Sequence, residues 1–258
     1  MTSTIVVPCF DEAARFDASA FTQLTEVVDR LILVDDGSTD RTPALLDQLA
    51  DTSSDGSVAV IRLGHNRGKA EAVRAGLQAA VAADASIVGY LDADFATPVS
   101  ELERLLAVIT KDPQLDAVLA SRVALLGHSI QRKATRHYLG RLYATAASLA
   151  LGVAVYDTQC GAKLFRVNDT LRAALADAFP DRWSFDVELL ARLLHPAAGV
   201  LPIDADQIVE VPLTEWHDVR GSKLHALPAA RSLLALAGVR RRMAAREKVR
   251  RAALDGAA

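Results

Sequence analysis

The chain has 258 residues, of which 51% are hydrophobic and 24% are charged, so it can bury a substantial core without disulfides. Its two cysteines, Cys9 and Cys160, lie far apart and have no partner at metal-ligand spacing, which favours a reducing, intracellular setting. The N-terminal residues lack the basic and apolar segments of a signal peptide, and no stretch approaches the roughly 20 apolar residues that cross a bilayer. We therefore expect a cytoplasmic protein, free or peripheral on the inner face of the membrane.

The net charge of −3 hides an uneven distribution. Residues 229–258 carry eight basic and two acidic side chains, so the remainder of the chain is acidic. The tail also holds the apolar segment Leu233–Val239, bracketed by arginines. Such a helix either lies on an anionic membrane, with about 1 kcal/mol from each nearby basic residue, or packs against the body with a solvated basic end. The acidic body and the lack of an aromatic platform argue against nucleic-acid binding.

The first 120 residues alternate short apolar runs with longer helical stretches. The apolar runs suit strands that are buried on both faces, and they are Thr4–Val7, Arg30–Val34, Val58–Leu63, Ser86–Leu91 and Asp116–Ala120. The predicted helices between them are Ala18–Asp29, Pro43–Asp51, Lys69–Ala83 and Ser100–Thr110. This alternation predicts an α/β fold with a doubly wound, mostly parallel sheet, in which ligands bind beyond the carboxyl ends of the strands.

The second half is less regular, with strands predicted at Lys163–Val167 and Gln207–Leu213. The predicted helices are Lys133–Leu151, Phe185–Leu194 and a long one from His225 to about Leu254, loosened at Gly238. No repeat or clear linker divides the chain. We expect one domain over residues 1–224, made of a Rossmann-like nucleotide-binding half (1–120) and an acceptor half (121–224), followed by a basic amphipathic helix over 225–258.

Polar side chains follow four consecutive predicted strands, which the needs of a core do not explain. The segments are Pro8–Glu12, Asp35–Asp40, Gly64–Lys69 and Asp92–Asp94. The carboxyl ends of parallel strands meet at one edge of a sheet, so these segments predict a single site there.

Asp92 and Asp94 end an apolar strand with two carboxylates spaced i, i+2. In a strand this spacing puts both side chains on one face, where the like charges repel unless a cation lies between or beside them. Oxygen ligands of this kind suit Mg²⁺ or Mn²⁺ bridging to nucleotide phosphates. Taken alone, the pair is equally consistent with a polar strand end in which an aspartate caps the next helix.

Two further segments have binding chemistry. Carboxylates in Asp35–Asp40 suit the donors of a base or ribose, although a helix-capping turn explains Asp40 better than Asp35. Asn66–Lys69 opens a helix with two cations and free backbone amides, which is an anion site without the glycine spacing of a P-loop.

These segments, in this order and spacing, resemble the family 2 glycosyltransferases of the GT-A fold. The segments Asp157–Phe165, Arg182–Leu190 and Glu210–Leu224 are similar to the dolichyl-phosphate β-glucosyltransferases and their bacterial polyprenyl-phosphate relatives. The resemblance covers about residues 3–225. We expect a departure from the family at the membrane anchors, because the sequence shows neither the amino-terminal helix of the eukaryotic relatives nor the carboxy-terminal spans of many bacterial ones.

The resemblance implies roles for individual residues. Asp92 would face the ribose and Asp94 would bind the metal, Mg²⁺ or Mn²⁺, with His217 as a weaker candidate for a second metal contact. Asp157 would lie beside the acceptor phosphate as the catalytic residue, a base or an orienting group. The other nucleotide-sugar-binding residues would be Pro8, Phe10, Glu12, Asp35 and Lys69, and the residues that hold acceptor phosphates would be Arg122, Arg136, Ser222 and Lys223.

The side chains of the segment from Arg182 allow more than one interpretation. Trp183 and Phe185 suit a core position better than sugar stacking. Asp186 and Glu188 suit either a contact with the acceptor or an exposed helix face.

The resemblance implies an inverting, metal-dependent transfer of a hexose, with glucose favoured, from a UDP-sugar to a polyprenyl or dolichyl phosphate. An ionised phosphate acceptor needs a base less than a hydroxyl does, so positioning and charge neutralisation account for the chemistry. The alternatives are a family 2 enzyme with a soluble acceptor, a nucleotidyltransferase, or a non-catalytic nucleotide-sugar-binding module. The last two fit less well, because no glycine-rich loop follows the first strand and all acidic motif positions are filled.

Overall fold

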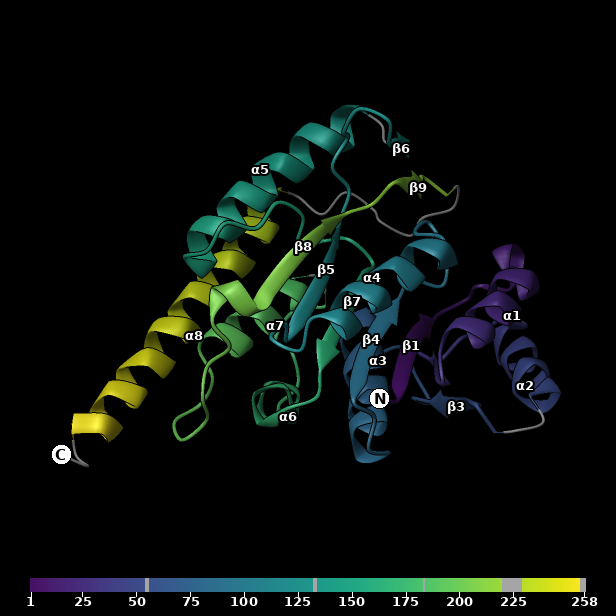
Figure 1. The fold of residues 1–258 in the computed structure, drawn as a ribbon, viewed down its shortest axis with the longest axis horizontal. Coiled ribbons are helices and arrows are strands. Elements are labelled where there is room, and N and C mark those ends of the chain that lie inside the picture. Colours follow the sequence, from purple (N-terminus) through teal and green to yellow (C-terminus); the bar gives the residue numbers. More distant parts are fainter. Residues whose placement is uncertain (54–55, 132–133, 183, 220–228, 256–258) are drawn as a thin grey trace.

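The computed structural model describes residues 1–53, 56–131, 134–182, 184–219 and 229–255, without the side chains of 134–139, 229–233 and 254–255. A seven-stranded sheet forms its centre (Figure 1). In spatial order the strands are β3 (Val58–Arg62), β2 (Arg30–Asp35), β1 (Ser3–Cys9), β4 (Ile87–Leu91), β7 (Ala162–Arg166), β5 (Ala117–Ser121) and β8 (Ile208–Pro212). The mostly parallel, doubly wound sheet predicted from the alternation is confirmed.

Helices cover both faces of the sheet, because the strands are apolar on both sides. One face packs against α1 (Ala18–Val27), α2 (Thr42–Thr52) and α4 (Val99–Lys111). The other face packs against α3 (Lys69–Ala82), α5 (Ala134–Leu151), α6 (Asp169–Ala176), α7 (Phe185–Leu194) and α8 (Ala229–Asp255). Local signals start several of these helices: the Asp17 carboxylate accepts from Ala20 N at 3.0 Å before α1, and Asn168 Oδ1 accepts from Leu171 N at 2.9 Å before α6.

The antiparallel strand β7 lies between β4 and β5 and joins the two predicted halves. In this register Tyr90 on β4 faces Lys163 on β7, and the Asp92 N–H donates to the Gly161 carbonyl at 3.0 Å. The strand that leads to the Asp92–Asp94 pair is therefore supported by residues that follow it by about seventy positions in the chain. A smaller two-stranded sheet joins β6 (Ser129–Gln131) to β9 (Glu215–His217), and short 3₁₀ turns occur at η1 (Ala13–Arg15) and η2 (Ala205–Gln207).

The long helix α8 packs against α5 and α7 (Figure 1). Leu236, Val239 and Met243 are buried in the core on that face of the sheet, whereas Leu234 is 73% exposed. This arrangement matches the packed-helix alternative for the apolar side of the tail. Among the described residues we find no helix whose length and apolarity would let it span a bilayer.

Candidate functional site at the carboxyl ends of the strands

Hydrogen bonds tie the loops after β1 and β2 together. Asp11, with a left-handed φ of 46°, accepts from Thr39 N at 2.7 Å, and its own N–H donates to Ser38 Oγ at 3.0 Å. The hydroxyl of Thr42, the first residue of α2, accepts from the Glu12 N–H at 2.7 Å. Because the strand ends are in register, with Cys9 beside Asp35, these contacts form one rigid rim.

Asp35 and Asp36 have different functions in this rim. The buried Asp35 carboxylate accepts from Ser38 N at 3.0 Å and so shapes its own turn. Asp36 accepts from the N–H groups of Arg67 and Gly68 at 2.7 and 2.8 Å, which fixes the loop before α3. Burial raises the pKa of Asp36, and these two N–H groups oppose the rise. Asp36 is thus a structural clamp for the predicted anion site, a role that the sequence did not separate from that of Asp35.

Lys69, the first residue of α3, contacts the predicted ribose and metal site directly. Its Nζ lies 2.5 Å from Asp92 Oδ1 and 5.7 Å from the centre of the Tyr90 ring. Burial lowers the pKa of Lys69, but Asp92 and Asp186 raise it more, so that the net pKa is raised. Lys69 therefore stays protonated beside Asp92, as a fixed positive charge at the strand end.

Asp94 lies beside a second cation, Arg15, that the sequence analysis missed. Arg15 Nη1 lies 3.6 Å from Asp94 Oδ2, and its Nη2 donates to Glu12 Oε1 at 2.8 Å. Burial and the neighbouring Asp92 carboxylate raise the pKa of Asp94. Arg15 follows Glu12 by one helical turn, and this spacing was the available signal.

The Asp92–Asp94 pair fits a divalent cation by its chemistry. It brings two carboxylates together at one strand end, and the raised pKa of Asp94 reflects burial and their mutual repulsion, which a bound cation would relieve. Within the described ranges no group of three or more His, Cys, Asp or Glu side chains is arranged to hold a metal. Asp92 and Asp94 would therefore be the protein ligands of the ion, and phosphate oxygens of a bound nucleotide would complete its coordination.

The backbone of His217 lies near the Asp92–Asp94 pair. The His217 N–H donates to the Ala96 carbonyl at 3.0 Å, two residues beyond Asp94, whereas its Nε2 lies 2.8 Å from Glu215 Oε1. A metal contact by His217 stays a prediction and would require the ring to leave Glu215.

Gly161 gives Asp92 its position. A Cβ at residue 161 would overlap the Asp92 carboxylate. We expect Gly161→Ala to displace Asp92 and Lys69 and to lower kcat/KM about 100-fold, since misplacement of about 1 Å has that effect. Steady-state kinetics would measure this change, with Ser100→Ala, at an exposed position of α4, as control. Equal activity of Gly161→Ala and the wild type would contradict the role.

Asp157 and Arg122 form a two-point ion pair on the acceptor side. Arg122 Nε donates to Asp157 Oδ2 at 2.6 Å and its Nη2 donates to Oδ1 at 2.8 Å. The N–H groups of Arg122 and Gln159 each add a bond of 3.1 Å, one to each carboxylate oxygen. Burial lowers the pKa of Arg122. The Asp157 carboxylate, with smaller contributions from Cys160 and Asp92, outweighs this effect, so that the net pKa is raised. The two predicted parts of the site are linked through the backbone, because the Asp92 N–H donates to the carbonyl of Gly161, four residues after Asp157.

A buried network lies behind Lys69 and was not assigned from the sequence. Lys163 Nζ donates to Asp186 Oδ1 at 2.8 Å and to the Cys160 carbonyl at 2.6 Å, and the Tyr90 hydroxyl also donates to Asp186. Asp186 is therefore buried and not on an exposed helix face, and Phe185 is a core residue as expected. Trp183 lies outside the described residues.

Glu188, the other acidic residue of α7, links this helix to α8. Its buried carboxylate accepts from Arg192 at 3.1 Å, from Arg242 at 2.9 and 3.0 Å and from Arg246 at 3.3 Å. Neither suggested location, an acceptor contact or an exposed helix face, holds for this residue. Glu188 instead binds arginines of two helices.

The remaining predicted residues are placed as follows. Pro8 is the last but one residue of β1 and is partly exposed, and Phe10 follows the strand in the rim. Arg136 belongs to α5, but its side chain is not described, and Ser222 and Lys223 lie outside the described residues. The predicted acceptor set is therefore defined here only through Arg122 and Asp157.

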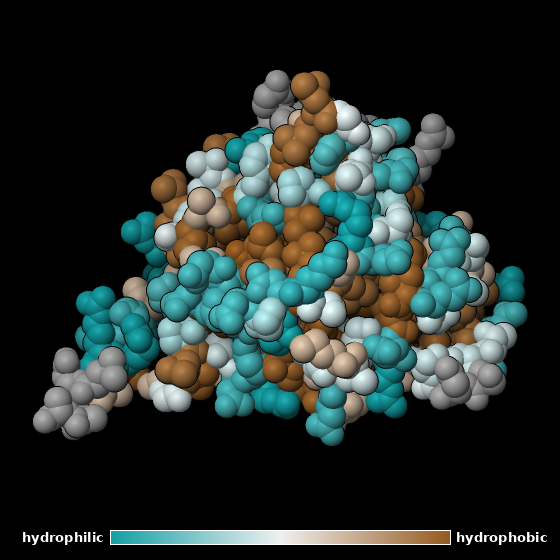
Figure 2. All heavy atoms as spheres, in the orientation of Figure 1, coloured by the Kyte–Doolittle hydropathy of each residue, from teal (hydrophilic) through white to brown (hydrophobic). Residues whose placement is uncertain are grey.

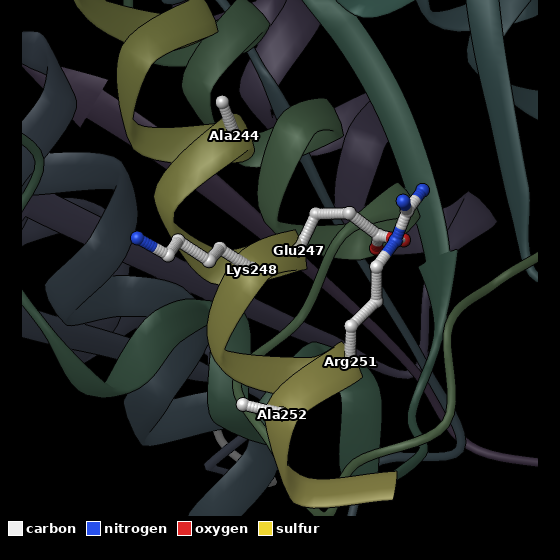
Figure 3. A pocket seen from close by; sticks show the side chains of 5 residues that line it. All are labelled: Ala244, Glu247, Lys248, Arg251 and Ala252. Atoms are coloured by element: carbon white, nitrogen blue, oxygen red, sulfur yellow. Dashed lines mark hydrogen bonds and ion pairs between the residues drawn. The ribbon is translucent and has the colours of Figure 1, made fainter. Parts of the chain in front are cut away.

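A shallow hollow of about 480 Å³ lies elsewhere, on the C-terminal half of α8 (Figure 3). It is lined by Ala244, Glu247, Lys248, Arg251 and Ala252. Hydrogen bonds from Arg250 and Arg251 lower the pKa of Glu247 to about 2. The hollow is an ion-paired helix surface, away from the strand ends that carry the site (Figure 1).

Comparison with known proteins identifies the family. The sequence profile described as glycosyl transferase family 2 matches residues 4–171. The chain belongs to this family. This family 2 glycosyltransferase is 27% identical over 239 residues to the dolichyl-phosphate beta-glucosyltransferase of Dictyostelium discoideum, covering 86% of this chain and 68% of that protein. The Saccharomyces cerevisiae protein of the same name is 29% identical over 251 residues, with the same coverage.

The fold of this family 2 glycosyltransferase also has solved counterparts. Glucosyl-3-phosphoglycerate synthase from Mycobacterium tuberculosis, in complex with Mn²⁺, uridine diphosphate and glucosyl-3-phosphoglycerate, matches with a TM-score of 0.65 at 19% identity. The match covers 93% of this chain and 79% of that one. The GT-A class expected from the sequence is confirmed at the level of the fold.

Proposed function

We propose that this glycosyltransferase moves a hexose, with glucose favoured, from a UDP-sugar to a polyprenyl or dolichyl phosphate with inversion. The names of the two relatives support the sugar and the lipid phosphate. The UDP and Mn²⁺ of the mycobacterial complex support the donor and a divalent metal, Mn²⁺ or Mg²⁺. In this proposal Asp94 and Asp92 would hold the metal, which would supply positive charge beside the diphosphate, and Lys69 neutralises charge that develops on the departing diphosphate.

The Asp157–Arg122 pair is the observation that carries the acceptor class. Among the described residues, each oxygen of the Asp157 carboxylate accepts two hydrogen bonds. We therefore assign Asp157 the role of orienting Arg122 and not that of a base. An acceptor that is already ionised, such as a phosphate monoester, needs no base and is attracted to the guanidinium. We therefore favour a phosphate oxygen over a neutral hydroxyl as the nucleophile.

A transfer assay with lipid extraction tests the proposal. The enzyme is incubated with labelled UDP-glucose, Mn²⁺ and polyprenyl phosphate in detergent, and the label is counted in the organic and aqueous phases. We expect the label in the organic phase. Product confined to the aqueous phase would favour the soluble-acceptor alternative. Parallel reactions with other UDP-hexoses identify the sugar.

Exposed leucines close to Arg122 support a lipid over a soluble acceptor. Leu125 and Leu126, in the loop after β5, are 46% and 103% exposed. Apolar side chains project from the molecule at the end that carries β6 (Figure 2). Leu125 and Leu126 follow Arg122 by three and four positions in the chain. They would offer an apolar surface to an isoprenoid chain whose phosphate is bound at Arg122. We further propose that this end of the molecule meets the membrane from which the lipid is taken.

Replacing both Leu125 and Leu126 by serine is expected to raise the KM for a long polyprenyl phosphate about tenfold, because less apolar surface is buried. The KM for a short, water-soluble prenyl phosphate should not change. Leu201→Ser is the matched control, since Leu201 is 83% exposed in the loop after α7. Equal KM values for the double variant and the control would contradict the role of these leucines.

A further inference from the structure

Glu210 contacts the Asp157 loop from β8, the edge strand of the sheet. Its two carboxylate oxygens accept from consecutive backbone amides, Tyr156 N at 2.6 Å and Asp157 N at 2.8 Å. This is a two-point contact between a strand and the chain segment that presents Asp157. None of the site roles expected for this chain includes Glu210.

The strand register explains how Glu210 and Arg122 hold the same residue. Strands β5 and β8 are parallel neighbours, with Leu119 beside Glu210 and Ser121 beside Pro212. Arg122 follows the last residue of β5 and binds the Asp157 side chain, whereas Glu210 on the adjacent strand binds its backbone. Two neighbouring strands therefore fix the backbone and the carboxylate of Asp157 separately.

The loop is held from α5 as well. The Arg141 guanidinium carbon lies 3.6 Å from the centre of the Tyr156 ring, and its Nη1 donates to the Tyr156 carbonyl at 3.5 Å. Tyr156 is thus bound through its N–H by β8 and through its ring and carbonyl by α5. This leaves Asp157 little freedom to shift along the loop.

The chemistry of the contact requires a carboxylate. A carboxylate has two oxygens that accept, so it satisfies both N–H groups at once. A glutamine of the same length would present one oxygen and one NH₂ group, and the NH₂ would face an N–H donor. One of the two amides would then lose its partner, and the loop would move to satisfy it.

We propose that Glu210 is a positioning residue for acceptor transfer, acting only through the placement of Asp157 and hence of Arg122. This inference rests on the function proposed above, because it assigns Asp157 and Arg122 to the acceptor side. The proposal treats the two substrates separately. Glu210 affects the acceptor step, whereas the group of Asp92 and Asp94 after β4 and Lys69 on α3 would bind the donor independently of it.

The test compares Glu210→Gln with the wild type and with Glu103→Gln, which makes the same exchange at an exposed position of α4. We expect Glu210→Gln to lower the kcat of transfer to polyprenyl phosphate about 100-fold, the usual effect of a misplacement of about 1 Å. The KM for the UDP-sugar and the calorimetric affinity for UDP with Mn²⁺ should not change. Unchanged kcat, or a matching loss of UDP affinity, would overturn the proposal.

A double-mutant cycle with Asp157→Asn separates positioning from a general structural effect. If Glu210 acts through Asp157, Glu210→Gln should cause little further loss in the Asp157→Asn background. The same fold-loss in both backgrounds would overturn the proposal. Thermal unfolding checks that each variant folds. If Glu210→Gln does not fold, Glu210→Asp takes its place, because it keeps two acceptor oxygens on a shorter side chain. Its loss of activity is then compared in the wild-type and Asp157→Asn backgrounds in the same way.

Hydrogen exchange supplies a readout that does not depend on the acceptor. The peptide that covers residues 153–161 should exchange faster in Glu210→Gln than in the wild type, because one of the two amides loses its partner and the loop loosens. Unchanged exchange would overturn the contact itself. If the wild-type enzyme is inactive on polyprenyl phosphate but Glu210→Gln still exchanges faster than the wild type, the proposed acceptor is contradicted. The contact between Glu210 and the Asp157 loop is supported in that case.

Discussion

Replacing Asp94 by alanine is expected to lower kcat/KM by about 1,000-fold or more, because the transition-state charge on the diphosphate would lose its metal. Asp94 is partly buried beside Asp92, and Arg15 Nη1 lies 3.6 Å from its Oδ2. Its carboxylate is thus placed to bind an ion from solution. Steady-state kinetics over a range of Mn²⁺ concentrations measure the change, together with calorimetry of Mn²⁺ binding in the presence of UDP.

Two variants define the specificity of that result. Asp51→Ala removes an exposed carboxylate from α2 and should leave both measurements unchanged. Asp94→Asn keeps the size of the side chain and should also lose metal affinity, because an amide oxygen is a weaker ligand than a carboxylate. Full activity of Asp94→Ala would remove the metal role that we assign to it.

Replacing Glu188 by alanine is expected to lower the free energy of unfolding by about 3–5 kcal/mol, because it leaves buried charges without compensation. Glu188 binds Arg192 on its own helix and Arg242 and Arg246 on α8. Burial already lowers the pKa of Arg192, and Glu188 opposes that shift. Without the carboxylate, the guanidiniums of both helices would repel one another.

Urea unfolding followed by circular dichroism measures this effect. Glu247→Ala is the matched control on α8, since Glu247 makes its ion pairs at the surface with Arg250 and Arg251. The control should unfold at the wild-type urea concentration, because exposed ion pairs contribute little. If both variants unfolded together, the Glu188 cluster would not be what attaches α8 to the body.

The sequence predicted the nucleotide-binding half well because its signals are local. Apolar runs gave the strands, and the polar segments after them gave Asp35, Lys69, Asp92 and Asp94 as neighbours at one edge. The alternation also gave the doubly wound class. Each of these inferences depends on residues close together in the chain.

Contacts between distant segments were not predictable in this way. Asp186 and Glu188 read as exposed or acceptor-facing, because helix periodicity alone does not reveal that Lys163 on β7 and arginines of α8 neutralise them. Arg15 and Glu210 were missed for a related reason. Their partners, Asp94 and the backbone of Asp157, come near only when the sheet assembles.

The insertion of β7 between β4 and β5 bears on how this enzyme can be divided. A chain that ended near residue 120 would leave β4 with an open edge and β5 with no neighbour, because β5 pairs only with β7 and β8 within the described sheet. The two halves are therefore not modules that a gene fusion or a truncation could exchange. The strand that leads to Asp92 and Asp94 gains its second neighbour only after residue 166 has been synthesised, so the sheet beside these two residues is completed late as the protein emerges from the ribosome.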